Sequence, residues 1–200
     1  MIRICILLLV FAVQVLVHPG PALAQTTYVI SPKQSLIQGS IRYSVIGKYV
    51  AHFEEFQGAI YFDTPGSPKS SVNLDITTQS IKSNFLSLDR IVVSGLLLNA
   101  AKFPHITFHS DSLEHIKGNE YKVKGKATLH GVTRELEFPF LITEWGTTLA
   151  GQEYLRAEGK WLIRRKDFGI TWNKLLDQGG VLVGDHITLD WSIVAIVPGK

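Results

Sequence analysis

Two pairs of charged residues could do chemistry in a chain that is otherwise strongly apolar. Asp89 and Arg90 are adjacent in a segment of helical period, and Arg165 and Asp167 flank the end of an apolar strand. An arginine beside a carboxylate can bind the polar head of an amphiphile, or it can form a local ion pair that locks a cap or a turn. The sequence leaves both roles open for each pair.

The motifs of common enzymes are incomplete in this chain. Ser94 lies in Val-Val-Ser-Gly-Leu, which lacks the first glycine of a nucleophile elbow. Asp167-Phe168-Gly169 spells a kinase motif, but no glycine-rich loop or catalytic-loop motif accompanies it. Glu135 and Glu137 resemble a glycosidase pair, yet they alternate with apolar residues and are expected on a solvated outer face. We therefore predict no catalysis, with a hydrolase as the weakest alternative.

Histidine spacing gives no metal site. His105 and His109 are four residues apart, and in an extended strand that separation is about 13 Å, too far for both to bind one zinc ion. Both alternate against Ile106 and Phe108, so we expect them to be exposed. The sequence predicts neither a metal nor a cofactor.

Apolar residues at period two predict the elements that must position these groups. The alternation recurs over about eight segments between residues 35 and 197, which is typical of an antiparallel sandwich or a closed barrel. A period of three or four over residues 85–101 predicts a short helical region, with Ser94 as the N-cap of a second helix that ends before Pro104. The residues predicted to line the interior are Phe53, Phe62, Phe108, Leu129, Phe138, Trp161 and Trp191.

Small residues interrupt two of the apolar strand faces. Gly125, Ala127, Ala157 and Gly159 occupy mid-strand positions where a filled core would more often place Val, Ile or Leu. They can mark bends and make room for tryptophan rings, or they can leave space for a ligand. The sequence alone leaves both interpretations open.

The first 24 residues have the pattern of a secretory signal peptide. A basic Arg3 precedes an apolar stretch over residues 4–17, and Ala22-Leu23-Ala24 forms a small-residue cleavage site. We expect cleavage before Gln25 and a periplasmic or secreted protein, with residues 25–200 forming a single domain. No later segment has the length of a membrane-spanning helix, so no stable membrane insertion is predicted.

The composition of residues 25–200 argues against some kinds of chemistry and of partner. The only cysteine of the chain, Cys5, lies inside the leader, so neither disulfides nor thiolate chemistry is expected beyond it. The basic and acidic residues nearly balance and form no basic run, which argues against a nucleic-acid partner. Whether the protein is a monomer or a homodimer is left open.

Several segments together resemble a known family. Residues 102–110 (Lys-Phe-Pro-His-Ile-Thr-Phe-His-Ser), 125–134 (Gly-Lys-Ala-Thr-Leu-His-Gly-Val-Thr-Arg) and 165–170 (Arg-Lys-Asp-Phe-Gly-Ile) come in the order, and near the spacing, of three signatures of the YceI-like family. Residues 53–63 are similar to its F-x-x-F-x-G-x-I-x-F-D stretch. The resemblance extends over essentially the whole chain after the leader.

The resemblance implies a fold and a function. It implies an all-β, antiparallel, eight-stranded lipocalin-like barrel, capped by the helical segment, that binds an isoprenoid chain or a similar amphiphile in its lumen. Family members are typically exported bacterial proteins, and some resemble carriers of polyprenyl or quinone-type lipids. Where relatives often show Arg-Asp at the start of the helix, this chain has Leu88-Asp89 with Arg90 one place later.

An alternative function uses aromatic side chains outside the interior. Trp145 and Trp172 lie near predicted loops, where their rings could stack on a sugar or contact another protein. The alternative to a lipid-binding barrel is thus a carbohydrate- or protein-binding β-sandwich module. Outward-facing aromatic rings would favour it.

Overall fold

The computed structural model describes residues 25–44, 47–63, 67, 69–174 and 182–199, so the predicted leader lies outside the described residues. The strands are β1 (Thr26–Ile30), β2 (Leu36–Tyr43), β3 (Gly47–Phe53), β4 (Phe56–Phe62), β5 (Ser71–Thr77), β6 (Ile81–Lys82), β7 (His105–Lys117), β8 (Glu120–Leu129), β9 (Val132–Thr147), β10 (Glu153–Arg164) and β11 (Val183–Ile196). The helices are α1 (Leu86–Val93) and the 3₁₀ turns η1 (Pro32–Gln34), η2 (Thr78–Ser80) and η3 (Arg165–Phe168).

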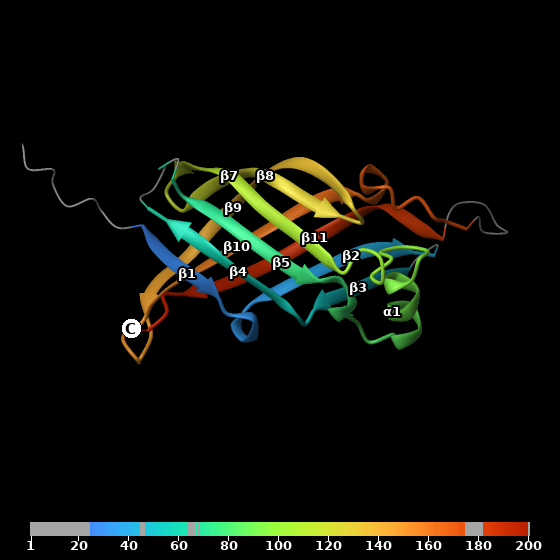
Figure 1. Ribbon diagram of the computed structural model, residues 1–200, viewed down its shortest axis with the longest axis horizontal. Coiled ribbons are helices and arrows are strands. Elements are labelled where there is room, and N and C mark those ends of the chain that lie inside the picture. The colour runs from blue at the N-terminus through green and yellow to red at the C-terminus, as the bar shows by residue number, and fades with distance from the viewer. Residues whose placement is uncertain (1–24, 45–46, 64–66, 68, 175–181, 200) are drawn as a thin grey trace, which may run out of the picture.

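The segments form a closed barrel of eight strands, because three of the strands are interrupted. η1 divides β1 from β2, residues 54–55 divide β3 from β4, and η2 divides β5 from β6. β11 closes the ring by pairing with β2 along its first part and with β1 along its last part. Figure 1 shows the strands crossing at a tilt around a common axis. The predicted antiparallel eight-stranded barrel is confirmed, and a sandwich is excluded.

Alternation along the strands separates the lumen from the solvent. On β8, Tyr121 and Val123 are buried in the lumen, whereas Lys124 and Lys126 are exposed. The exposed side chains meet charges of opposite sign across the sheet, since Lys126 is paired with Glu135 of β9 in the strand register. Cross-strand pairs of this kind favour one register, and a slip of one residue would place the lysines in the apolar lumen.

A bulge between β9 and β10 changes which residues of β9 face inward. Arg156 lies opposite Glu144, but Ala157 lies opposite Ile142, so one residue of β9 has no opposite partner. Because of the extra residue, the side chains of β9 that face inward change from even-numbered to odd-numbered positions beyond the bulge. Trp145, which the sequence placed near a loop, consequently packs edge-on against Phe62, with 5.0 Å between ring centroids.

The helical segment is shorter than the sequence predicts. α1 ends at Val93, and Ser94 turns into an extended conformation while its hydroxyl donates to the carbonyl of Ile91. Ser94 is thus a C-cap, and the predicted second helix after it is wrong: residues 95–102 form successive turns, with Asn99 in the left-handed region. A serine in an extended conformation ends the helical hydrogen-bond ladder because its backbone cannot continue it.

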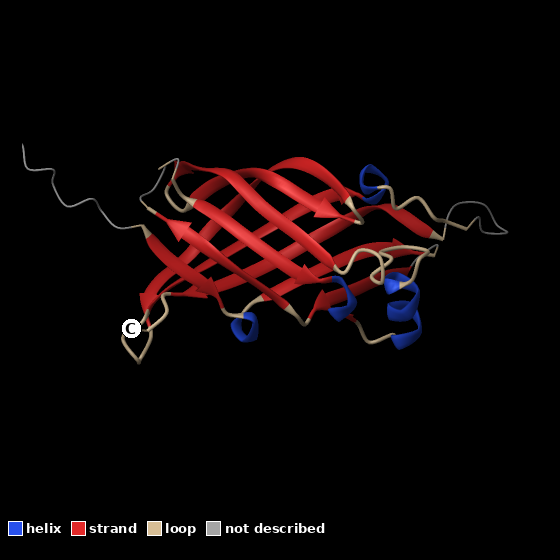
Figure 2. Ribbon diagram, viewed as in Figure 1, coloured by secondary structure: helices blue, strands red, loops and turns tan. Residues whose placement is uncertain are grey.

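One end of the barrel is covered by residues 83–104, which we call the cap. Figure 2 shows α1 and the following loop gathered at that end, away from the C-terminus. Leu98 of the cap belongs to a buried cluster with residues of β8, β10 and η3. A second buried cluster, with Phe62 and Phe140, fills the barrel from its middle to the opposite end. Residues of both clusters line the space inside the barrel.

Candidate functional site

The interior of the barrel contains a cavity of about 300 Å³. Its wall is built by side chains of every long strand and by Val92, Leu97 and Leu98 of the cap. Apart from the tryptophan indoles, Ser40, Tyr49, Thr107 and Arg165 are the polar or charged residues among those that line it. A wall of this composition repels water and ionised groups and accepts apolar ones.

All of the residues predicted to line the interior lie at the wall of this cavity. Each comes from a different strand: Phe53 from β3, Phe62 from β4, Phe108 from β7, Leu129 from β8, Phe138 from β9, Trp161 from β10 and Trp191 from β11. Each of them lies on the inward face that period-two alternation predicts. Their contact with a ligand stays a prediction.

Aromatic rings stack along the lumen. Phe138 lies on Trp161 with 5.2 Å between centroids and an interplanar angle of 27°. Tyr121 and Phe140 stack in the same way at 5.5 Å and 26°. Offset stacks of this kind add to the burial of the rings and hold them in fixed orientations. The lumen therefore presents flat apolar surfaces along its length.

The small residues serve packing at some positions and leave space at others. A side chain at Gly159 would overlap the indole of Trp191, so this glycine lets the ring lie against β10. A side chain at Gly125 would overlap the carbonyl of His109, next to a register shift of β7. Ala127 and Ala157, in contrast, line the cavity. Packing thus accounts for the two glycines, and space for a ligand beside the two alanines stays a prediction.

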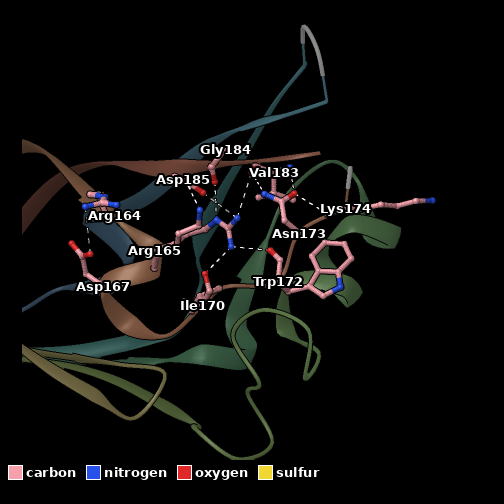
Figure 3. A network of polar contacts seen from close by, with 11 residues as sticks. Arg164, Arg165, Asp167, Ile170, Trp172, Asn173, Lys174, Val183, Gly184 and Asp185 are labelled. Carbon is pink, nitrogen blue, oxygen red and sulfur yellow. Dashed lines mark hydrogen bonds and ion pairs between the residues drawn. The ribbon is translucent and has the colours of Figure 1, made fainter. Parts of the chain in front are cut away.

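Arg165 is buried at the cap end of the barrel, with 1% of its surface exposed. Its Nε donates to the carbonyl of Gly184 at 2.8 Å, and Nη1 donates to the carbonyls of Ile170 and Trp172 at 2.7 and 2.9 Å. Nη2 reaches the carbonyl of Val183 and, at 3.3 Å, the carboxylate of Asp185. Figure 3 shows these contacts converging on the guanidinium.

These contacts occupy the hydrogen-bonding capacity of Arg165. A guanidinium has five N–H donors, and the five acceptors just named account for them. Burial lowers the pKa of Arg165, and the nearby Asp185 carboxylate opposes that shift. Arg165 therefore joins η3, residues 170–172 and the start of β11 into one unit, and it has no donor left for a ligand. Of the two roles that the sequence allowed, the structure favours the lock.

Asp89 is buried and joins the cap to the barrel wall. Its carboxylate accepts hydrogen bonds from the hydroxyl of Tyr49 at 2.7 Å and from the backbone N–H and hydroxyl of Ser83 at 3.0 and 2.5 Å. Burial alone would raise the pKa of Asp89, but the hydrogen bonds from Ser83 and Tyr49 outweigh it and hold that pKa below its usual value. Burial and the bond to Asp89 both raise the pKa of Tyr49.

Arg90 and Asp167 are not brought to the cavity wall. Arg90 is exposed on the outer side of α1, and Asp167 is exposed on η3, where its carboxylate lies 3.9 Å from Arg164 Nη1. The sequence analysis paired Arg90 with Asp89 and Asp167 with Arg165, and both of these partners are buried. A polar head inside the lumen would meet neither Arg90 nor Asp167.

Comparison with known proteins places the fold in a family. The sequence profile described as "YceI-like domain" matches residues 28–195. The chain belongs to the YceI-like family. A curated relative named Protein YceI, from Salmonella arizonae, is 37% identical over 124 residues, which is 60% of this chain and 62% of that protein. The match thus spans less than two thirds of the length of this relative.

Two solved structures share the fold. BcnA of Burkholderia cenocepacia superposes with a TM-score of 0.72 at 20% identity, covering 83% of this chain and 99% of that one. A polyisoprenoid binding domain from Saccharophagus degradans superposes with a TM-score of 0.64 at 13% identity, covering 88% of this chain and all of that one. At these identities the likeness establishes the YceI-like fold.

Sequence analysis missed some polar residues of the cap end. Tyr49 shares the inward face of β3 with Phe53, and the parity of the strand could have placed it in the lumen. Asn173 gave no such signal: its side chain accepts from the backbone N–H of Val183 and donates to its carbonyl, as a neighbouring strand would. Asn173 and Val183 are ten residues apart in the sequence, and they meet because β11 begins beside η3.

Several ionisable groups on the barrel exterior form surface pairs. His105 Nδ1 lies 2.7 Å from Asp75, and His109 Nδ1 lies 2.9 Å from Asn73 Oδ1. Glu137 pairs with Lys122 at 3.3 Å. Within the described ranges, no group of three or more His, Cys, Asp or Glu residues is placed to hold a metal ion. The same ranges contain no helix of the length and apolarity needed to cross a membrane.

Proposed function

We propose that this protein is an exported, non-enzymatic binding protein that holds an isoprenoid-type amphiphile, such as a polyprenyl lipid or a quinone-like molecule, in its barrel lumen. The observation that carries the proposal is the apolar cavity of about 300 Å³. It falls at the lower end of the range of roughly 300–1,000 Å³ that ligand pockets span.

The cost of such a cavity supports an occupant. Cavities in protein cores cost roughly 24 cal/mol per Å³, so a volume of about 300 Å³ corresponds to about 7 kcal/mol if nothing fills it. The whole stability of a typical domain is only roughly 5–15 kcal/mol. An apolar chain in the lumen would restore the missing contacts and remove most of this cost.

The chemistry of the wall favours a neutral, unsaturated chain. Arg165 has no free donor, and the hydroxyl of Tyr49 already donates to Asp89, so the lumen offers little compensation for an ionised carboxylate. The stacked rings of Phe138 and Trp161 present flat faces on which the planar double bonds of an isoprenoid, or a quinone ring, can lie. These features argue against a fatty acid bound with its charged head inside.

The relatives support the same class of ligand. The Saccharophagus degradans protein with this fold is described as a polyisoprenoid binding domain. Export from the cytoplasm is supported by the leader-like pattern of residues 1–24. The biological purpose proposed for such binding is transport, storage or stress protection of the lipid.

A pair of substitutions on β8 tests the proposal. Ala127 lines the cavity, whereas its neighbour Lys126 is exposed on the outer face. Ala127→Leu should fill part of the lumen and weaken binding of a prenylated quinone at least ten-fold, while Lys126→Leu should leave the affinity unchanged. The measurement is quenching of the tryptophan fluorescence, to which Trp161 and Trp191 at the cavity wall contribute, during titration with the quinone. Equal affinities of the two variants, or no quenching of the unmodified protein, would overturn the proposal.

A further inference from the structure

The outer side of the cap carries a concentration of exposed apolar side chains. Of the large apolar residues that are exposed in the described ranges, Phe85, Leu86, Ile91 and Leu96 fall within a stretch of twelve residues, and the others are scattered over the strands and turns. Phe85 is 58% exposed and Leu86 is 68% exposed. Single exposed apolar residues are common on proteins, but a cluster of them marks an interaction surface.

Five exposed cations lie at the same end of the barrel as this cluster. Arg90 and Lys102 belong to the cap, Arg42 and Lys48 lie at the adjoining end of β2 and β3, and Lys174 follows η3. All five are exposed, and none of them has a described carboxylate within 4.0 Å, the limit for an ion pair. Within the described residues, no ion pair neutralises their charges.

The carboxylates described at this end of the barrel do not neutralise these cations. Asp89 is buried beneath the cap, Asp185 lies between Arg165 and Lys166, and Asp167 lies beside Arg164. Arg42 and Lys48 are also direct partners in the strand register of β2 and β3. Like charges directly opposite each other destabilise a sheet, so an anionic partner would relieve a cost that the fold itself carries.

The opposite side of the same segment forms the cavity wall. Val92, Leu97 and Leu98 face the lumen, while Leu86 and Leu96 face the solvent. The cap is thus a thin partition between the apolar lumen and the exposed apolar cluster. A surface that contacted the cluster would lie next to the cavity.

We propose that the cap docks on the surface of a lipid bilayer that contains anionic lipids. Phe85, Leu86, Ile91 and Leu96 enter the interfacial layer, and the five cations contact the phosphates of the head groups. Docking would place the lumen beside the acyl chains, so that a ligand can pass between them without crossing water. The docking surface itself does not depend on the proposed lumen ligand.

The combination of charge and apolarity argues for a bilayer over a folded partner protein. Each cation close to an anionic membrane strengthens binding about five-fold, and such attraction is lost at high salt. A buried Phe or Leu adds at least a further ten-fold. A mixture of both signals at one end of a molecule is the composition of interfacial membrane-binding surfaces.

Sedimentation with vesicles tests this proposal on the mature protein. We expect binding to vesicles of equal parts phosphatidylcholine and phosphatidylglycerol, little binding to phosphatidylcholine alone, and release by molar salt. Phe85→Ser with Leu86→Ser should weaken binding at least ten-fold, and serine at position 85 also suits the N-cap of α1, so folding is preserved. Arg42→Gln with Lys48→Gln should weaken binding by a similar factor.

Matched controls lie away from the cap. Leu149→Ser with Ile116→Ser removes two other exposed apolar side chains, and Lys33→Gln with Lys69→Gln removes two exposed cations. Both should leave vesicle binding unchanged. Absence of binding to anionic vesicles, or an equal loss in the control variants, would overturn the proposal. Quinone quenching in solution is measured in parallel, and it reports on the lumen independently of the vesicles.

Discussion

Arg165 shows how a charged residue in an apolar lumen can be structural. Its donors bind carbonyls of four residues that lie in two separate segments, Ile170 and Trp172 on one side and Val183 and Gly184 on the other. Without the guanidinium, the carbonyls of Ile170, Trp172 and Gly184 would lose this donor while staying partly or fully buried, whereas the carbonyl of Val183 would keep the side chain of Asn173. A buried acceptor left unsatisfied costs more than the net gain of the bond it has lost.

Replacing this arginine should therefore destabilise the fold strongly. We expect Arg165→Leu to lower the free energy of unfolding by roughly 3–5 kcal/mol, because several buried polar groups lose their partner at once. Arg164→Leu is the matched control, since Arg164 is exposed and makes only a long ion pair with Asp167; it should change stability by less than about 1 kcal/mol. Urea denaturation of both variants measures the difference, and similar midpoints for the two would contradict the role of Arg165.

The carboxylate of Asp89 makes stability depend on pH. Its pKa is lower in the folded protein than the usual 3.8, so its contribution is fully present above that value and is lost as the pH falls through the folded pKa. We expect Asp89→Asn to destabilise the protein at neutral pH and the difference from the unmodified protein to shrink below about pH 4. Denaturation curves across this range test it; a difference that did not change with pH would show that ionisation of Asp89 contributes nothing.

At the scale of elements, the cap is the part of the structure that should open first. α1 has only eight residues, and helices of that length depend on tertiary contacts. Its main polar contact with the wall is the bond between Tyr49 and Asp89. Strand β8, in contrast, is paired with β7 on one side and with β9 on the other along nearly its whole length.

This difference predicts an order of hydrogen exchange. Backbone amides of α1 should exchange faster than those in the centres of β8 and β9, and Tyr49→Phe should accelerate exchange in α1 alone. Exchange followed by mass spectrometry of peptides provides the measurement. Equal acceleration in the strands would show instead that Tyr49 supports the whole barrel and not the cap.

The sequence predicted elements whose pattern is local and missed those that depend on distant contacts. Period two located the inward faces of β7 to β11, and with them the aromatic lining. The turn at residues 54–55, which divides β3 from β4, was not predicted, although it lies within the family-like stretch of residues 53–63. β1 was missed, because Thr26–Ile30 is short and its partners, β4 and β11, are remote in sequence.

In the candidate site, too, the local patterns were predicted and the distant contacts were missed. Apolar lining residues follow from alternation, whereas the roles of the charged residues depend on which side chain is buried. The local sequence does not distinguish Arg165 from Arg164, or Asp89 from Asp167. Arg165 is buried because η3 turns it toward the start of β11, and Asp89 is buried because α1 packs on Tyr49. Closure of the sheet into a barrel was predicted from the family resemblance, because periodicity alone fits both a barrel and a sandwich.

At the scale of the whole molecule, the cavity and stability are linked. A ligand that binds only the folded barrel stabilises it by about 2.7 kcal/mol at a free concentration of a hundred times its Kd. For a domain of this size, each kcal/mol raises Tm by roughly 2–4 °C. We therefore expect a prenylated quinone to raise Tm by about 5–10 °C, and the same concentration to have less effect on Ala127→Leu. Differential scanning calorimetry measures the shift; an unchanged Tm of the unmodified protein would contradict a filled lumen.

The most direct test of the central claim is native mass spectrometry of the mature protein after export from a bacterial host, followed by organic extraction and identification of what is bound. We expect one prenyl lipid or quinone for each protein chain, or its stoichiometric uptake when long-chain prenyl lipids are added. A protein that carries no such molecule and takes up none would contradict a lipid-binding lumen.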